Sequence, residues 1–174
     1  TDLMPTLDAI YRVSCGEPAS STSAYSGSEN LNNRANVLYI SPAKALSADQ
    51  LTALTSYNLP GLHAASYDGD TPTGERRWIR EHANFILTTP DMLNYSILSN
   101  HRQWASFLRG LRYVVLDEAH SYRGVFGAHI ANLLRRLRRV CALYRTVPVF
   151  YGASATSSNP VESFSKLIGV PQQA

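Results

Sequence analysis

Two acids and a histidine directly follow an apolar run in this chain. The run 114–116 precedes Asp117, Glu118, Ala119 and His120. Magnesium in nucleotide sites is held by one or two carboxylates together with phosphate oxygens and water, and a neighbouring carboxylate can orient or deprotonate an attacking water. Two adjacent acids at a strand end can divide these roles, although such a pair can also simply cap the next helix. The pattern therefore indicates phosphate chemistry, and this interpretation needs support from the rest of the sequence.

His120 is the remaining polar residue of this acidic motif. The next histidine along the chain, His129, lies nine positions on, which argues against a zinc site. We expect His120 to link the acidic motif to neighbouring loops through hydrogen bonds. An α/β hydrolase that uses Asp117, Glu118 and His120 on a small substrate is an alternative, but it leaves the other motifs unexplained.

A pair of hydroxyl residues follows the next apolar run downstream. Ser154 and Thr156 flank Ala155 after the run 148–151. Small hydroxyl groups on a tight loop can bridge adjacent loops by hydrogen bonds. Alone this is a generic turn, but its position one predicted strand after the acidic motif makes it a candidate coupling element.

Two further polar segments combine helix-start chemistry with possible phosphate binding. Thr89, Pro90 and Asp91 fit a helix start, with Thr89 as N-cap and Pro90 in the first helical position. The same helix N-terminus could hold a backbone phosphate of a nucleic acid. The segment 41–44 offers the same two interpretations, with Lys44 as the phosphate partner. Both interpretations stay open on the local sequence.

Short apolar runs alternate with amphipathic segments, and they predict strands and helices respectively. The predicted strands cover 37–40, 63–67, 84–88, 112–116 and 147–151. The predicted helices cover 2–13, 42–57, 73–82, 101–109, 124–144 and 159–168, and another helix starts at Pro90. This alternation predicts an α/β domain with a mostly parallel central sheet and helices on both faces. Ligands of such sheets bind outside the carboxyl ends of the strands, where the polar segments 42–46, 68–71, 88–91, 117–120 and 154–156 all fall.

The composition narrows the class of protein. The chain has 174 residues, of which 44% are hydrophobic and 17% charged, as is usual for one soluble domain. No apolar run reaches the roughly 20 residues that span a bilayer, so we expect no membrane association. Cys15 and Cys141 have no metal-ligand spacing and indicate reduced thiols in a cytoplasmic protein. The net charge of +3 permits nucleic-acid binding without requiring it.

Two segments depart from the regular pattern. Residues 14–36 are rich in Ser, Gly and Asn, which predicts a long flexible surface loop, either an insertion or a functional flap. Residues 135–139 contain four arginines around Leu137. Because Leu134 and Leu137 keep the apolar register, we interpret this run as the solvated face of a helix rather than as a nucleic-acid patch.

In this order, the motifs resemble those of the first motor domain of superfamily 2 helicases, the DEAD/DEAH-box group with a RecA-like, three-layer fold. The matching segments are 117–120 for motif II, 154–156 for motif III, 38–46 for motif Ia, 67–72 for the motif Ib region, and 87–93 for the Thr-Pro-acid motif after it. Segments 75–80 and 121–127 are similar to the MrfA (YprA) branch, which is related to the Lhr-type helicases.

The resemblance implies an ATP-dependent DNA helicase that moves 3′ to 5′ and acts in DNA repair, with ATP and Mg²⁺ as cofactors. It implies that Asp117 holds Mg²⁺ through water and that Glu118 activates the hydrolytic water. His120, Ser154 and Thr156 would couple the ATP site to DNA. The implied partners are single-stranded or tailed duplex DNA and a second RecA-like domain of the same parent chain. The single-strand track would include Pro42, Lys44, Asp70, Thr71, Thr89 and Arg123.

One part of the family pattern is missing from the sequence. The chain contains no Gly-x-x-x-x-Gly-Lys-Ser/Thr loop, which in the family precedes the helix that here begins near Leu3, and Ala43 stands where motif Ia often has threonine. We therefore expect residues 1–174 to form motor domain 1 without its phosphate-binding loop and to be inactive alone. The alternative is a degenerate RecA-like module that binds nucleic acid or protein without ATPase activity. The intact Asp117 and Glu118 argue against degeneracy.

Overall fold

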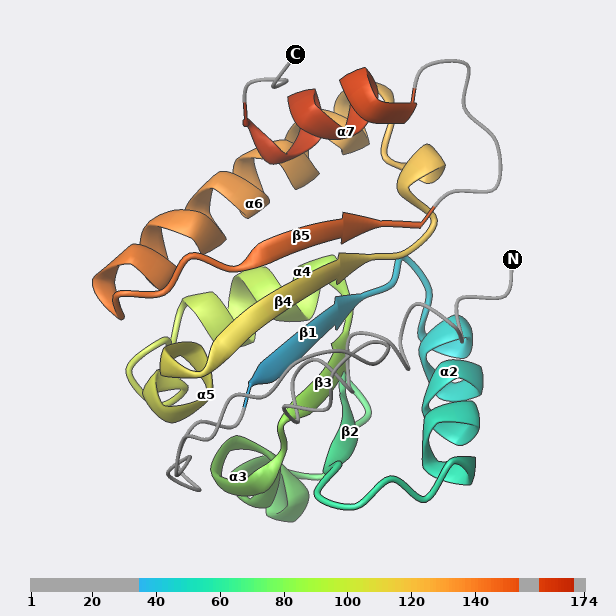
Figure 1. The fold of residues 1–174 in the computed structure, drawn as a ribbon, viewed down its shortest axis with the longest axis vertical. Helices are drawn as coiled ribbons and strands as arrows, with labels where there is room; N and C mark the ends of the chain where they lie inside the picture. The colour runs from blue at the N-terminus through green and yellow to red at the C-terminus, as the bar shows by residue number, and fades with distance from the viewer. Residues whose placement is uncertain (1–34, 154–159, 171–174) are drawn as a thin grey trace, which may run out of the picture.

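A five-stranded sheet forms the centre of the computed structural model, which describes residues 35–153 and 160–170. The strand order is β2-β3-β1-β4-β5, and each strand runs parallel to its neighbours (Figure 1). The strands are β1 (Asn36–Ile40), β2 (Ala64–Tyr67), β3 (Phe85–Thr88), β4 (Leu111–Leu116) and β5 (Val149–Gly152). The predicted parallel α/β fold is confirmed.

Helices connect the strands. They are α2 (Lys44–Ser56), α3 (Thr73–His82), α4 (Pro90–Met92), the π-helix η1 (Leu93–Leu98), α5 (Ala105–Arg109), the 3₁₀-helix η2 (Ala119–Ser121), α6 (Gly124–Leu143) and α7 (Pro160–Ile168). In the described ranges, no helix is both long and apolar enough to cross a membrane.

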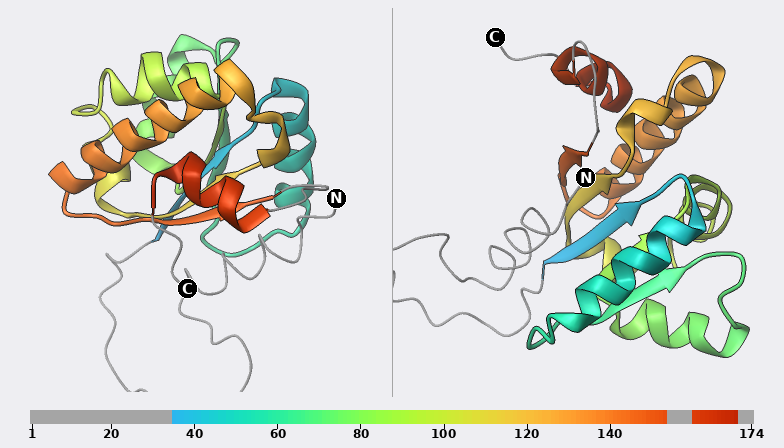
Figure 2. Two further views of the ribbon diagram at one scale, coloured as in Figure 1. Left: turned by 90° about the horizontal axis from the view of Figure 1, so that it is seen from above. Right: turned by 90° about the vertical axis from the view of Figure 1, so that its right-hand side faces the viewer.

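Alternate side chains of the strands enter two separate cores. On β1, Val37 and Tyr39 pack on the same face as Leu54 of α2, whereas Leu38 and Ile40 pack on the face that α3, η1, α5 and α6 cover. Figure 2 shows α2 on one side of the sheet and α6 on the other. Because side chains of a strand alternate between faces, continuous apolar runs are what a sheet covered on both faces requires.

The predicted helix boundaries were wrong at two places. The helix predicted from Pro42 begins at Lys44, because Ser41 and Pro42 still belong to the extended exit from β1, where the Ser41 hydroxyl donates to the Ala43 carbonyl at 3.1 Å. The helix predicted over 101–109 is regular only from Ala105, after hydrogen-bonded turns at 101–104.

Further differences concern β5, the helix predicted from Pro90 and the N-terminal part of the chain. The strand predicted over 147–151 covers Val149–Gly152, and the helix that starts at Pro90 becomes a π-helix after Met92. Asn36, which the sequence places in the long loop, is the first residue of β1, and its side-chain amide donates to the Phe107 carbonyl at 2.7 Å. The helix predicted over 2–13 and residues 14–34 of the predicted loop lie outside the described residues.

Candidate functional site

The carboxyl ends of all five strands lie level with one another. Cα pairing joins Tyr67 to Thr88, Thr88 to Ile40, Ile40 to Leu116, and Leu116 to Gly152. The residue after each of these positions therefore starts a loop at the same edge of the sheet. The predicted clustering of the strand-end segments is confirmed for the four segments that the structure describes.

Asp117 is held firmly at this edge. Its amide donates to the Ile40 carbonyl at 2.9 Å, and its carboxylate oxygen Oδ1 accepts the Glu118 amide at 2.8 Å. The residue is only 5% exposed, so its carboxylate is largely removed from water. Among the described residues, no lysine or arginine pairs with Asp117, which leaves its negative charge available for a cation.

Glu118 adopts a left-handed backbone conformation with φ 50° and ψ 43°. A non-glycine residue in this region costs on the order of 1 kcal/mol, and such strain gathers at functional sites. The turn leaves the Glu118 side chain about one-third exposed beside the buried Asp117. The Asp117 carboxylate is thus buried, and the Glu118 carboxylate is accessible to solvent. This difference is compatible with the separate roles that the sequence predicts for the two acids.

Two tyrosine hydroxyls flank the acid pair, and sequence reasoning missed both. Tyr39 and Tyr122 are 0% and 6% exposed, and neither hydroxyl has a hydrogen-bond partner in the described part of the chain. The Asp117 carboxylate is close enough to act on Tyr39, although the two groups do not meet hydrogen-bond geometry. Burial first, and then the charge of Asp117, raise the pKa of both hydroxyls. Both hydroxyls are therefore neutral groups close to the Asp117 carboxylate.

The pairing of β1 with β4 explains why Tyr39 lies near Asp117, and knowledge of this pairing would have identified Tyr39. Tyr39 pairs with Val115 on the neighbouring β4, and both side chains enter the same core. Because strand side chains alternate, Asp117 follows Val115 on that face. The position of Tyr122 depends on a close backbone approach. A Cβ atom on Gly127 would lie 2.4 Å from the Tyr122 carbonyl oxygen, so glycine is required there.

His120 lies beside Glu118 in the short helix η2. Its Nδ1 is 3.1 Å from Glu118 Oε2, a distance that permits an ion pair when the ring is protonated, but the atoms are not aligned for a hydrogen bond. His120 and Arg123 also line a hollow of about 610 Å³ between η2, α6 and α7. The structure therefore places the His120 ring beside the Glu118 carboxylate.

The acidic loop is joined to the end of β5 through the backbone. The Ala153 amide donates to the Leu116 carbonyl at 2.9 Å, and the Ala119 amide donates to the Ala153 carbonyl at 2.8 Å. Ser154 and Thr156 themselves lie outside the described residues. The residue immediately before Ser154 is nevertheless in direct contact with the acidic motif.

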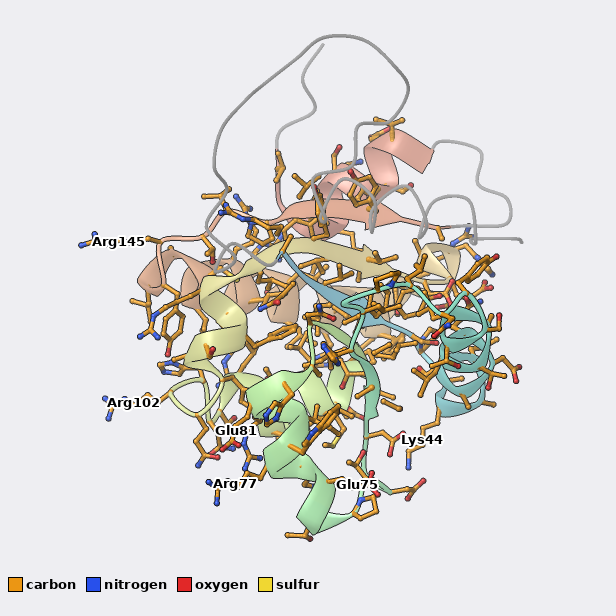
Figure 3. All side chains as sticks on the ribbon, turned by 60° about the horizontal axis from the view of Figure 1, so that its bottom comes forward. Lys44, Glu75, Arg77, Glu81, Arg102 and Arg145 are labelled. Atoms are coloured by element: carbon orange, nitrogen blue, oxygen red, sulfur yellow. The ribbon has the colours of Figure 1, made fainter. Side chains whose placement is uncertain are left out.

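The loops after β1 and β2 meet through their side chains. Lys44 Nζ lies 2.8 Å from Asp70 Oδ2, and this bond raises the pKa of the lysine. Both side chains are exposed, and Lys44 projects toward solvent from the start of α2 (Figure 3). The Thr71 hydroxyl accepts the Asp68 amide at 2.9 Å, which closes the β2 loop. Lys44, Asp70 and Thr71 thus form one polar surface.

The other predicted track residues have more local roles in the structure. Thr89 caps α4, and its hydroxyl accepts the Met92 amide at 3.4 Å, as predicted. Pro42 is half-buried in the exit from β1, and Arg123 is exposed at the N-cap of α6. Pro42, Lys44 and Thr89 all lie at the strand-end edge, but no hydrogen bond joins Thr89 to the Lys44–Asp70 pair in the described ranges.

The donor set at Asp117 fits a magnesium ion shared with phosphate. Mg²⁺ prefers oxygen ligands, keeps several waters, and commonly takes one or two carboxylates from the protein. Here a buried carboxylate without a cationic partner among the described residues lies close to two tyrosine hydroxyls that have no hydrogen-bond partner there. Among the described residues, no group of three or more His, Cys, Asp and Glu could hold a metal.

The all-parallel sheet with helices on both faces is that of a RecA-like domain. The DEAD/DEAH box helicase family matches residues 4–164, so the chain belongs to that family. It is 44% identical over 144 residues to the ATP-dependent helicase YprA of Bacillus subtilis, with 81% of this chain and 19% of YprA covered.

Two solved structures agree with this assignment. The helicase MrfA bound to DNA superposes with a TM-score of 0.76 at 42% identity, with 80% of this chain and 19% of MrfA covered. The helicase Lhr of Mycobacterium smegmatis, bound to single-stranded DNA and AMP-PNP, gives a TM-score of 0.62 at 29% identity, with 76% and 18% covered. The predicted placement in the MrfA and Lhr-like branch is confirmed. The chain spans about a fifth of the length of these relatives.

Proposed function

We propose that this chain is part of an ATP-dependent DNA helicase, in which residues 1–174 form motor domain 1. The observation that carries the proposal is the buried Asp117 beside a left-handed, accessible Glu118 at the carboxyl edge of a parallel sheet. Membership in the DEAD/DEAH box family and the DNA-bound relatives support it.

We assign separate roles to the two acids. Asp117 would hold Mg²⁺ through water, and the bound ion would neutralise charge on the ATP phosphates. The accessible Glu118 carboxylate would accept a proton from the attacking water. Tyr39 and Tyr122 would flank the Asp117 carboxylate as neutral hydroxyl groups, and burial raises the pKa of both.

Coupling between ATP and DNA would pass from the acidic loop into the segment after β5. His120, Ser154 and Thr156 are the proposed coupling residues. The backbone bond between Ala119 and Ala153 supports this route, because it ties the acidic loop to the start of that segment.

The DNA track would cross the other strand-end loops. Lys44, Asp70, Thr71 and Thr89 present an ammonium group, a carboxylate and hydroxyls at one edge, with Pro42 and Arg123 along the same route. We further propose translocation from 3′ to 5′, a role in DNA repair, a second RecA-like domain as the partner across the ATP site, and a cytoplasmic location. These finer assignments rest on the family resemblance.

The test uses the parent protein with Glu118→Gln. We expect DNA-stimulated ATP turnover to fall by about 10²- to 10⁴-fold, the range typical of a lost general base, while ATP affinity is retained. Glu81→Gln on α3, an exposed acid outside the site, is the matched control and should leave turnover unchanged. Normal turnover in Glu118→Gln would contradict the assigned role.

Residues 1–174 alone are expected to hydrolyse no ATP, because the sequence lacks the phosphate-binding loop. A Glu118-dependent ATPase in this segment would refute that expectation. A parent protein that binds DNA but lacks any ATPase would instead favour the degenerate interaction module.

A further inference from the structure

A groove of about 490 Å³ lies between η1 and α6, on the helical face of the sheet that α2 does not cover. Tyr95 projects from η1 and is 73% exposed, and Phe126 projects from α6 and is 47% exposed. Both aromatic rings line the groove from opposite walls. Exposed apolar side chains that gather in one groove, unlike scattered ones, mark binding surfaces.

The groove is also lined by two arginines and a histidine. His129, Arg136 and Arg139 line it, and Asp91 is the one acid among the described lining residues. Arg139 is exposed and has no carboxylate partner in the described part of the chain. Between positions 92 and 161 the sequence contains nine arginines and, as acids, only Asp117 and Glu118. The groove therefore attracts anions.

The helix η1, which carries Tyr95, forms one wall of the groove. It has an unusual helix type, and a residue of α6 on the other wall holds it in place. Six residues, Leu93–Leu98, form a π-helix. The Arg136 guanidinium donates to the Asn94 side-chain oxygen at 2.5 Å and to the Asn94 carbonyl at 3.3 Å. π-Helical turns are rare and frequently mark functional sites. Arg136, predicted to belong to a solvated helix face, instead fixes the geometry of this wall.

The groove continues from the proposed DNA track. Its lining includes Pro90 and Asp91, which directly follow the N-cap Thr89 at the strand-end edge. A strand that passes Thr89 therefore meets a channel with aromatic walls and cationic side chains. Proteins that hold single strands without sequence preference use this combination, with bases on aromatic rings and phosphates on cations.

We propose that this groove binds single-stranded nucleic acid, with bases stacked on Tyr95 and Phe126 and a backbone phosphate paired with Arg139. The inference rests on the proposed function and extends its track beyond the strand-end loops. An acidic peptide segment would also suit the arginines, but it would not use two exposed rings on facing walls.

The first experiment measures the affinity of the parent protein for a fluorescent single-stranded oligonucleotide by anisotropy. The double variant Tyr95→Ala, Phe126→Ala should bind at least about tenfold more weakly, since each lost stack is worth a factor of this order. Arg139→Gln should reduce the slope of log affinity against log salt concentration by about 0.7, the value of one single-strand phosphate contact. Unchanged affinity and unchanged slope would overturn the proposal.

Two control variants lie on the same helix or just beyond it, outside the groove. Leu143→Ala removes an exposed apolar side chain, 70% exposed, near the end of α6. Arg145→Gln removes an exposed arginine that points away at the edge opposite Lys44 (Figure 3). Both should bind the oligonucleotide as the wild type does. Equal losses in these controls would mean that general charge and not the groove binds the strand.

A second experiment separates this inference from the proposed function. Tyr95→p-benzoylphenylalanine in the parent protein should crosslink to a radiolabelled oligonucleotide without ATP being present. If wild-type protein shows no DNA-stimulated ATPase but the crosslink forms, the proposed function fails while the groove assignment holds. Crosslinks to a peptide segment alone would overturn the groove assignment and indicate a protein partner.

Discussion

The loop after β4 and the loops after β1 and β2 lie on the same edge of one sheet but are held in different ways. The β4 loop is fixed by backbone hydrogen bonds to β1 and β5, and its Asp117 is buried. The β1 and β2 loops meet through one exposed ion pair, Lys44–Asp70. Backbone bonds and burial resist both salt and side-chain substitution, whereas exposed ion pairs are weak and screened. The fixed loop suits chemistry on phosphate, and the adjustable one suits a strand that must move.

The largest expected effect comes from a substitution in the loop after β4, which backbone hydrogen bonds hold in place. Asp117→Asn in the parent protein removes the charge that would hold Mg²⁺ while it keeps the shape of the side chain. We expect DNA-stimulated ATP turnover to fall by on the order of 10²- to 10³-fold. The readout is steady-state turnover over a Mg²⁺ titration, with Glu81→Gln on α3 as control. Near-normal turnover would show that the buried acid is structural.

A second prediction compares glycines in the two regions. Gly127→Ala places a Cβ atom 2.4 Å from the Tyr122 carbonyl oxygen, behind the acidic loop. We expect it to lower the free energy of unfolding by about 1–3 kcal/mol, as overpacking does. Gly74→Ala, beside the β2 loop in α3, meets no atom within 4 Å and should be neutral or stabilising by up to about 1 kcal/mol. Urea denaturation measures both, and equal effects would contradict the close approach.

A third prediction concerns alkaline pH. Burial raises the pKa of Tyr39 and Tyr122 above the ordinary value of 10.0, and that of the Cys141 thiol from 9.0 to about 11. The folded state then holds these protons more tightly than the unfolded state. Stability is therefore complete below about pH 9. The contribution of Cys141 is lost between pH 9 and about 11, and that of the two tyrosines is lost progressively above pH 10, by up to about 1.4 kcal/mol per pH unit for each group.

Tyrosine substitutions test the source of this pH dependence. Tyr39→Phe should flatten the loss of stability above pH 10 in urea denaturation, because one of the shifted groups is gone. Tyr57→Phe removes a tyrosine that is 48% exposed and should leave the slope unchanged. The same slope in both variants would mean that Tyr39 does not titrate as its burial implies.

The smallest expected effect comes from substitutions in the loops after β1 and β2, which meet through the exposed Lys44–Asp70 ion pair. Lys44→Ala should leave the thermal midpoint unchanged, because its ion pair is exposed, and should weaken single-strand binding severalfold in low salt. Asp70→Asn breaks the same pair while it retains the lysine, so it should leave strand binding equal or stronger. Differential scanning fluorimetry and anisotropy measure the two properties. Loss of stability in either variant would show that this loop pair is as fixed as the β4 loop.

Much of the fold follows from local sequence chemistry. The apolar run 37–40 predicts a strand, and the apolar run 114–116 predicts that the acidic motif directly follows a strand. Thr89 and Pro90 predict the start of a helix, because they fit the N-cap and the first helical position. These signals act over a few residues, so one sequence is enough to read them. The position of Asp117 at the sheet edge then follows from the parallel topology.

The unpredicted features all depend on contacts between distant segments. Tyr39 meets Asp117 because β1 and β4 are neighbours, and the Lys44–Asp70 pair needs the β1 and β2 loops to converge. The π-helix over Leu93–Leu98 is held by Arg136, which lies 42 positions from its partner Asn94. Periodicity cannot report such pairs, because the helix type and the partner are decided by packing.

The link between Ala119 and Ala153 has a consequence for how the family can be studied. It consists of peptide groups alone, so any residue with an amide proton can occupy either position and preserve it. Comparison of side chains across relatives would therefore overlook this link. It would also escape alanine scanning, since both positions are already alanine. At Ala119 the substitution that removes the donated hydrogen bond is proline, which lacks the amide proton.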